Sequence, residues 1–159
     1  MQRIAGQSKS NEDNRSDSPC KIFLSCIPPK TTHHAKRIVR VKGFARLADK
    51  PELTAAKDTY EALLCQHQIG TPYEGFLSVV IEVTWPWRKD TPKYKRVLGR
   101  VRCNTKPDAD DFAKTLIDSL VRMRFIYEDS QVSELVVRKF WGDVPGVAIE
   151  IRHLEEDGV

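Results

Sequence analysis

The sequence lacks the features that define several broad classes of protein. No segment approaches the roughly 18 consecutive apolar residues that a membrane-spanning helix needs. The first residues contain no apolar stretch of the kind found in secretory signals. No unit of sequence is repeated along the chain. These absences predict a cytoplasmic protein and argue against a membrane, secreted or repeat architecture.

Metal-binding cysteine motifs are also absent. The cysteines are Cys20, Cys26, Cys65 and Cys103, and they form no Cys-x-x-Cys pair and have no histidine at zinc-finger spacing. Their even number permits two disulfides, but without a secretory signal we expect reduced thiols. The adjacent residues His33 and His34 lie in a basic segment and are weak candidates for a metal pair.

Positive charge is concentrated in two segments, although the net charge is only +4. Residues 30–46 contain no acid, and residues 88–106 contain a single one, Asp90. Lysine and arginine contacts to phosphate give salt-dependent affinity for nucleic acids. The candidate phosphate contacts are Lys30, Lys36, Arg37, Arg40, Arg88, Lys89, Lys93, Lys95, Arg96, Arg100, Arg102 and Lys106. The alternative is a solvated loop with no ligand. Trp85, Trp87 and Tyr94 are candidates for stacking on unpaired bases, but Trp85 fits core packing equally well.

Hydrophobic periodicity predicts the order β-β-β-α-β-α-β-β in one domain over residues 20–154. We expect strands at residues 21–27, 37–41, 44–47, 76–85, 131–141 and 147–152, and helices that begin at Pro51 and near Asp108. The strand at 76–85 is apolar on both faces in its middle and should be central. Residues 86–106 should form a long connection without regular structure. Residues 1–19 predict a disordered tail and residues 155–159 a short acidic tail. The predicted fold is α+β, with two helices packed on one mixed β-sheet.

Carboxylates gather where the second helix begins. Asp108, Asp110 and Asp111 lie there, Lys114 follows one turn later, and Glu128 and Asp129 precede the strand at 131–141. Acids at a helix start can simply cap N–H groups, and the spacing of Asp110, Lys114 and Asp118 fits a salt-bridge ladder. No capping role explains the pair at 128–129. That pair favours a three-acid site for Mg²⁺, a cation that takes oxygen ligands and neutralises like charges.

The stretch from Lys106 resembles the signature of the RusA family of Holliday-junction resolvases. It reads Lys-Pro-Asp-Ala-Asp-Asp-Phe-Ala-Lys-Thr-Leu-Ile-Asp-Ser-Leu and is followed, after a short gap, by Glu-Asp-Ser-Gln-Val. The family pattern is Lys-Pro-Asp-x-Asp-Asn, then Lys and Asp-x-Leu on the same helix, then Asp-Asp-x-Gln-Val. A looser agreement extends over nearly the whole chain from about residue 21, including the strand that ends in Pro-Pro.

The resemblance implies a RusA-like fold and a Mg²⁺-dependent endonuclease, with Mn²⁺ as the alternative ion. Asp108, Asp110 and Asp129 are implied to bind the metal, and Lys114 is implied to be the catalytic lysine. The expected reaction is the resolution of four-way junctions in recombination and repair by paired symmetric nicks with 5′-phosphate and 3′-hydroxyl ends. The resemblance also implies a homodimer that matches the near two-fold symmetry of the junction. Resolvases of this type are often carried by phages.

Two positions depart from the family pattern. Asp111 stands where the family usually has Asn, and Glu128 stands where it usually has Asp. Together with Asp118, which we expect to orient Lys114, these residues should lie beside the metal-binding acids without being ligands. Two alternatives remain open. One is a metal-dependent nuclease that prefers flaps, forks or other branched DNA, and the other is a catalytically silent protein that binds junctions.

Overall fold

The computed structural model describes residues 18–31 and 34–155. Most of the predicted N-terminal tail therefore lies outside the described residues, as do His33 and residues 156–159 of the predicted acidic tail. All four cysteines are described, and all are free. Among the described residues, no helix is long and apolar enough to cross a membrane.

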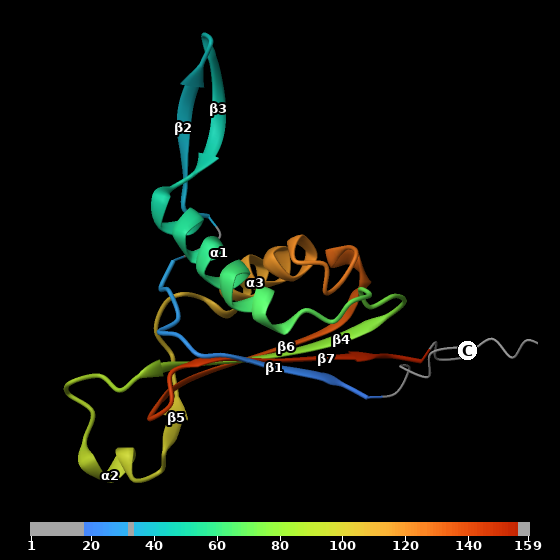
Figure 1. Cartoon of the computed structure of the whole chain (residues 1–159). Coiled ribbons are helices and arrows are strands. Elements are labelled where there is room, and N and C mark those ends of the chain that lie inside the picture. Colours follow the sequence, from blue (N-terminus) through green and yellow to red (C-terminus); the bar gives the residue numbers. More distant parts are fainter. Residues whose placement is uncertain (1–17, 32–33, 156–159) are drawn as a thin grey trace, which may run out of the picture.

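A mixed five-stranded sheet forms the base of the molecule (Figure 1). Its strands are β1 (Cys20–Leu24), β4 (Leu77–Pro86), β5 (Arg100–Arg102), β6 (Val132–Gly142) and β7 (Gly146–His153), in the order β1-β7-β4-β6-β5. Strands β4 and β6 are parallel, and the remaining neighbours are antiparallel. The predicted α+β fold and the central place of β4 are both confirmed.

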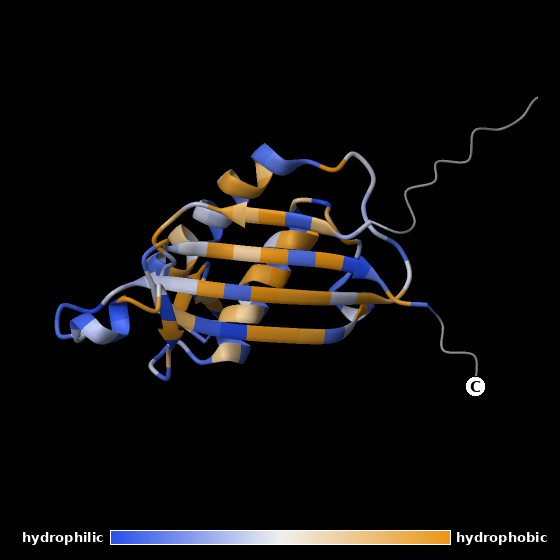
Figure 2. Ribbon diagram, turned by 90° about the horizontal axis from the view of Figure 1, so that it is seen from below, coloured by the Kyte–Doolittle hydropathy of each residue, from blue (hydrophilic) through white to orange (hydrophobic). Residues whose placement is uncertain are grey.

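Two helices cover one face of this sheet, α1 (Pro51–Leu64) and α3 (Ala109–Arg122) (Figure 1). The covered face of β4 presents Val79, Ile81, Val83 and Trp85, all of them at most 1% exposed. Helix α3 buries Phe112, Leu116 and Leu120 against them. Figure 2 views the opposite face, where the strands lie in front of the helices. The hydrophobic core therefore lies between these two helices and one face of the sheet.

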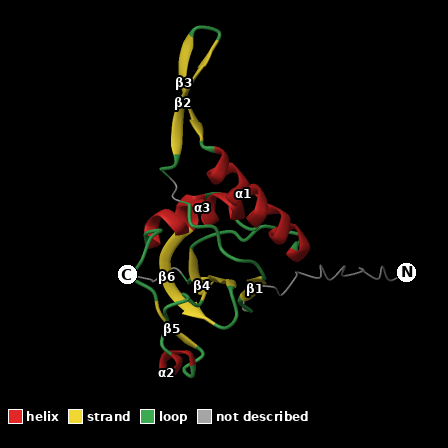
Figure 3. Cartoon of the chain, turned by 90° about the vertical axis from the view of Figure 1, so that its left-hand side faces the viewer, coloured by secondary structure: helices red, strands yellow, loops and turns green. Residues whose placement is uncertain are grey.

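Strands β2 (Lys36–Val41) and β3 (Phe44–Asp49) form a hairpin that is not part of the main sheet. The hairpin projects beyond α1, away from the five-stranded sheet (Figures 1 and 3). Both residues of its turn have positive φ, 50° at Lys42 and 83° at Gly43. Positive φ at both positions is the mark of the type I′ turn, whose twist matches that of paired strands. The predicted hairpin is therefore present, but as a separate arm.

The predicted unstructured connection at residues 86–106 contains two short elements. Helix α2 (Lys93–Arg96) has four residues, and β5 has three and pairs with β6 at the edge of the sheet. The expectation of a segment without regular structure was therefore wrong. The first strand also ends earlier than expected, at Leu24, and the three following residues lead to Pro28 and Pro29.

Candidate active site

The first part of the candidate site lies at the N-terminus of α3. Asp108 is the N-cap residue, with extended backbone angles, and its carbonyl accepts a hydrogen bond from the N–H of Phe112 at 3.1 Å. Its carboxylate makes no capping hydrogen bond. Asp110 lies in the first turn and is exposed, like Asp108. Helix capping therefore does not account for the Asp108 carboxylate, which is available to a ligand.

The segment that leads into α3 is fixed by a lysine from the sheet. Lys139 of β6 donates hydrogen bonds through Nζ to the carbonyls of Thr105 and Pro107, at 2.7 Å each. Lys139 pairs with the buried Val83 of β4, so its side chain projects from the helix-covered face. The Lys106–Pro107 peptide bond is cis. The two hydrogen bonds from Lys139 fix the backbone on either side of Lys106 and directly before Asp108. The sequence did not predict this role of Lys139.

The second part of the site is a short 3-10 helix, Asp129–Gln131, directly before β6. Glu128 is its N-cap and forms a reciprocal capping box with Gln131. The inference that no capping role explains Glu128 was therefore wrong, because the three-residue helix was not predicted. The Glu128 carboxylate accepts a hydrogen bond from the backbone N–H of Gln131 and is therefore less available to a metal ion. Both residues are exposed, and Asp129, with its side chain 53% exposed, is the acid of this pair that contacts Lys114.

Gln131 holds the turn that carries Asp129. Its side-chain oxygen accepts hydrogen bonds from the N–H groups of Tyr127 and Glu128, at 2.8 and 3.0 Å. Its side-chain nitrogen donates to the carbonyls of Tyr73 and Gly75, at 3.1 and 3.3 Å. One side chain thus ties the turn to a loop more than fifty residues earlier. The Gln-Val step of the motif was the available sequence signal for this role.

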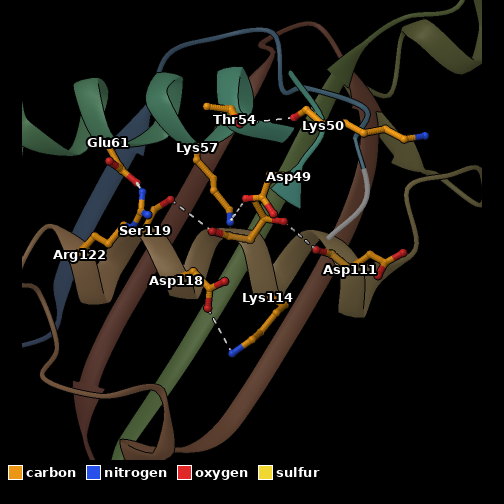
Figure 4. A network of polar contacts seen from close by, with 11 residues as sticks. Asp49, Lys50, Thr54, Lys57, Glu61, Asp111, Lys114, Asp118, Ser119 and Arg122 are labelled. Atoms are coloured by element: carbon orange, nitrogen blue, oxygen red, sulfur yellow. Dashed lines mark hydrogen bonds and ion pairs between the residues drawn. The ribbon is translucent and has the colours of Figure 1, made fainter. Parts of the chain in front are cut away.

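Lys114 joins the two parts of the site. Its Nζ lies 2.5 Å from Oδ2 of Asp129 and 3.2 Å from Oδ1 of Asp118, one turn along α3. Figure 4 shows Lys114 directed toward Asp118 on the outer side of the helix. The hydrogen bond to Asp129 is the main reason that the pKa of Lys114 is raised, and the same bond lowers the pKa of Asp129. Lys114 is therefore a fixed positive charge and Asp129 a fixed negative one at neutral pH.

The remaining acid of the helix start, Asp111, faces the base of the hairpin. One of its carboxylate oxygens lies 3.4 Å from Nε2 of His34. Its side chain is only 12% exposed, in contrast to Asp110 and Asp129. Asp111, which stands where the family usually has Asn, therefore contacts the segment that leads into β2.

The donor chemistry of the site suits a hard cation. Asp108, Asp110 and Asp129 offer exposed carboxylate oxygens, which Mg²⁺ prefers. No three His, Cys, Asp or Glu residues within residues 18–31 and 34–155 lie close enough together to enclose a metal ion. Mg²⁺ commonly takes only one or two carboxylates, keeps several waters and is completed by substrate phosphate. The structure therefore does not bring Asp108, Asp110 and Asp129 together as a closed three-acid site, and an ion held here would need water and substrate phosphate as further ligands.

The predicted phosphate contacts are spread over five segments of the chain. Arg37 and Arg40 are exposed on β2, and Lys93, Lys95 and Arg96 belong to α2. Lys106 is exposed two residues before Asp108. Lys30 lies over the ring of Trp141 at 4.7 Å, and Arg102 lies over Phe140 at 5.3 Å. Arg96 donates to the carbonyls of Arg88 and Thr91 and therefore also braces its own loop.

The three aromatic candidates for base stacking have different surroundings. Trp85 is 1% exposed and donates from Nε1 to the carbonyl of Pro28 at 2.8 Å, so it is a core residue. Trp87 donates to Asp143 at 2.6 Å. Tyr94 of α2 is 71% exposed and is the one of the three whose ring is open to a ligand.

Comparison with known proteins covers nearly all of the chain. The family model described as Endodeoxyribonuclease RusA matches residues 5–152. The chain is also 36% identical over 118 residues to the uncharacterized protein YqaN of Bacillus subtilis (strain 168), which covers 70% of this chain and 82% of that protein. The family match includes both segments that Lys114 connects, the start of α3 and the turn before β6.

Proposed function

Because the chain belongs to the RusA family of endodeoxyribonucleases, we propose that it is a Mg²⁺-dependent enzyme that resolves Holliday junctions in DNA recombination and repair. In this proposal Asp108, Asp110 and Asp129 hold the metal, and Lys114 is catalytic. Residues 20–154 constitute the endonuclease domain. The active form is a homodimer, because two sites related by a two-fold axis match the symmetry of a four-way junction and allow paired nicks.

One observation carries this proposal: Lys114 contacts Asp129 across fifteen residues of sequence. The contact places an acid from the edge of the sheet beside the helix that presents Asp108 and Asp110. Acidic side chains from both segments, together with a lysine, are the groups that phosphodiester hydrolysis needs. A surface salt bridge alone would be worth less than about 1 kcal/mol and would not explain the free carboxylate of Asp108.

The chain's own residues supply binding, orientation and charge. When bound, Mg²⁺ supplies an activated water nucleophile and neutralises charge on the scissile phosphate. Lys106 contacts a phosphate next to the cut, because it is exposed and directly precedes the acids. Lys114 keeps its proton, since Asp129 raises its pKa, and therefore stabilises the charge that develops on the leaving oxygen rather than abstracting a proton. Asp118 orients the Lys114 ammonium at 3.2 Å.

The test is cleavage of a synthetic four-way junction by the full-length protein. Symmetric nicks are expected with Mg²⁺, or with Mn²⁺ as the alternative ion, and none in EDTA. Asp110→Asn should lower the rate by at least about a hundredfold, since it removes a charged ligand without changing shape. Asp58→Asn is the matched control, because Asp58 is exposed on α1 and should leave the rate unchanged.

Linear duplex and flap DNA, added to the same assay, separate the alternatives. Faster cleavage of flaps or forks than of junctions would keep the chemistry and change the substrate. Tight junction binding without nicks in any divalent metal would leave a binding protein and contradict the enzymatic proposal.

A further inference from the structure

The hairpin formed by β2 and β3 exposes large apolar side chains that no other element within residues 18–31 and 34–155 covers. Ile38 is 74% exposed, Phe44 75% and Leu47 67%. An isolated two-stranded hairpin is marginally stable in water, so exposed apolar groups on it need a reason. The arm stands away from the five-stranded sheet and beyond α1 (Figure 3). We propose that the hairpin is a DNA-binding arm and that Phe44 at its tip stacks on bases exposed at the branch point of junction DNA.

The register of the hairpin separates two faces. Cross-strand partners share a face, so the pairs Val41 with Phe44, Val39 with Arg46 and Arg37 with Ala48 lie together. The opposite face carries Lys36 with Asp49, Ile38 with Leu47 and Arg40 with Ala45. The face of Phe44 thus combines an exposed aromatic ring with two arginines and no acid, the composition of surfaces that bind unpaired bases and their phosphates.

Charge identifies DNA rather than a second copy of the chain as the occupant. The strands and turn carry Lys36, Arg37, Arg40, Lys42 and Arg46, against one acid, Asp49. Asp49 already forms an ion pair with Lys57 of α1 at 2.8 Å (Figure 4). Two such arms would repel each other, whereas a polyphosphate would attract both faces. A two-stranded ribbon also fits the major groove of DNA, which is about 12 Å wide.

The aromatic tip identifies branched DNA rather than plain duplex. In a continuous duplex each base face is covered by its neighbours. An exposed aromatic ring therefore finds no base face to stack on there. At a branch point the stack is interrupted, and apolar side chains can insert between bases there. Val41 pairs with Phe44 beside the Lys42–Gly43 turn, so the ring lies at the end of the arm.

The base of the arm is fixed close to the candidate active site. The N–H of Lys50 donates to the carbonyl of Ala35 at 2.8 Å, which closes the base of the hairpin. His34, two residues before β2, contacts Asp111 in the first turn of α3. An arm of six residue pairs reaches about 20 Å from this point. A branch point held at the tip would therefore lie about 20 Å from the acids, which is less than the roughly 34 Å of one helical turn of DNA and would set the distance between branch and cut.

The inference rests on the proposed function for its ligand, branched DNA, and it is tested by binding without cleavage. The dissociation constants of full-length wild type, Phe44→Ala, Phe44→Trp and Ile38→Ala are measured in EDTA. The probes are a four-way junction and a linear duplex built from its arms. Phe44→Ala should weaken junction binding at least about fivefold and duplex binding less than twofold. Phe44→Trp should bind the junction like wild type.

Ile38→Ala is the matched control, because Ile38 is as exposed as Phe44 but lies on the opposite face. It should leave both affinities unchanged. Equal loss of junction and duplex affinity in Phe44→Ala, or none in either, overturns the proposal. Sedimentation of the same variants at equal concentration adds a second criterion, since conversion of a wild-type oligomer to monomer by Phe44→Ala would assign the face to a second copy. Junction nicking by wild type in Mg²⁺ is scored separately, so a failure of the enzymatic function remains distinguishable.

Discussion

At the scale of single residues, the central feature is that Lys114 contacts carboxylates from two elements. It lies 2.5 Å from Asp129 and 3.2 Å from Asp118. Both contacts, the first of them dominant, raise its pKa. A lysine with a raised pKa is protonated throughout the neutral range, so in the proposed mechanism Lys114 acts through its charge and does not remove a proton.

Replacing this charge should affect turnover more than binding. We expect Lys114→Met to lower kcat on a four-way junction by about a hundredfold or more, because a preorganised charge at the reacting phosphate is lost. Junction affinity in EDTA should change less than about threefold, since Lys114 is committed to two acids rather than to DNA phosphate. Single-turnover cleavage at saturating enzyme gives the first value and a gel-shift titration the second.

Arg122→Met provides the control for this experiment. Arg122 lies on the same helix and is also ion-paired, to Glu61 at 2.9 Å, but it belongs to the last turn (Figure 4). Its replacement removes the same charge and should leave kcat within about twofold of wild type. A Lys114→Met enzyme with wild-type kcat would show that the lysine is only part of a surface salt bridge.

The sequence was informative about residues whose role depends on close neighbours. Asp110, Lys114 and Asp118 are spaced along one helix, and the predicted pairing of Lys114 with Asp118 is present. Glu128 was misjudged because its capping partner lies in a three-residue 3-10 helix with no periodicity to detect. Lys139 was missed for another reason, since its acceptors are more than thirty residues away and only the fold brings them together. The three metal-binding assignments and the DNA contacts stay predictions.

At the scale of elements, strand β6 positions helix α3. The bonds from Lys139 to the carbonyls of Thr105 and Pro107 connect the sheet to the segment before the helix. We expect Lys139→Met to lower stability by about 2 kcal/mol, because two charge-assisted hydrogen bonds are lost and two carbonyls are left without them. It should also raise the Mg²⁺ concentration for half-maximal cleavage, because Asp108 is then less firmly placed.

A purely structural role would change stability alone, so the metal titration decides between the two. Arg138→Met is the matched control, because Arg138 precedes Lys139 on β6 and its side chain lies on the other face of the sheet, where it bonds to Glu82. That variant should lose stability and keep the wild-type Mg²⁺ requirement. An unchanged requirement in Lys139→Met would contradict the positioning role, and partial restoration by Lys139→Arg would support it.

The elements that the sequence predicted are those with a complete pattern of their own. Strand β4 was placed correctly because it is apolar on both faces, and α1 because Pro51 marks its first turn. Helix α2 and strand β5 have too few residues for either period, and β5 exists only through its pairing with β6. The hairpin was expected from its turn residues. Its separation from the sheet was not, because apolar side chains on both faces do not distinguish a buried strand from an exposed arm.

At the scale of the whole molecule, the two faces of the sheet have different roles. The face beneath α1 and α3 holds the core and, through α3, the candidate active site. In the part of the chain that the structure describes, no helix covers the opposite face (Figure 2). This face carries charged pairs instead, including Glu82 with Arg100 at 2.8 Å and with Arg138 at 3.0 Å. Glu82 is on the central strand, so these pairs connect β4 to both β5 and β6.

These pairs should make the stability of the protein depend on pH. The hydrogen bond from Arg100, aided by Arg138, lowers the pKa of Glu82 below that of an unfolded chain, although partial burial opposes the shift. A carboxyl group with a lowered folded pKa contributes stability above its unfolded pKa, and this contribution disappears as the pH falls through the folded pKa. We expect Glu82→Gln to cost about 0.5–1 kcal/mol at pH 7 and little at pH 3, because the arginines are half exposed and solvent screens them. Chemical unfolding of both proteins between pH 3 and pH 7 measures the difference, with Glu134→Gln, an exposed residue on the same face of β6, as the control. Parallel stability curves for wild type and Glu82→Gln would show that the carboxylate contributes nothing through its charge, and that packing alone holds the open face of the sheet together.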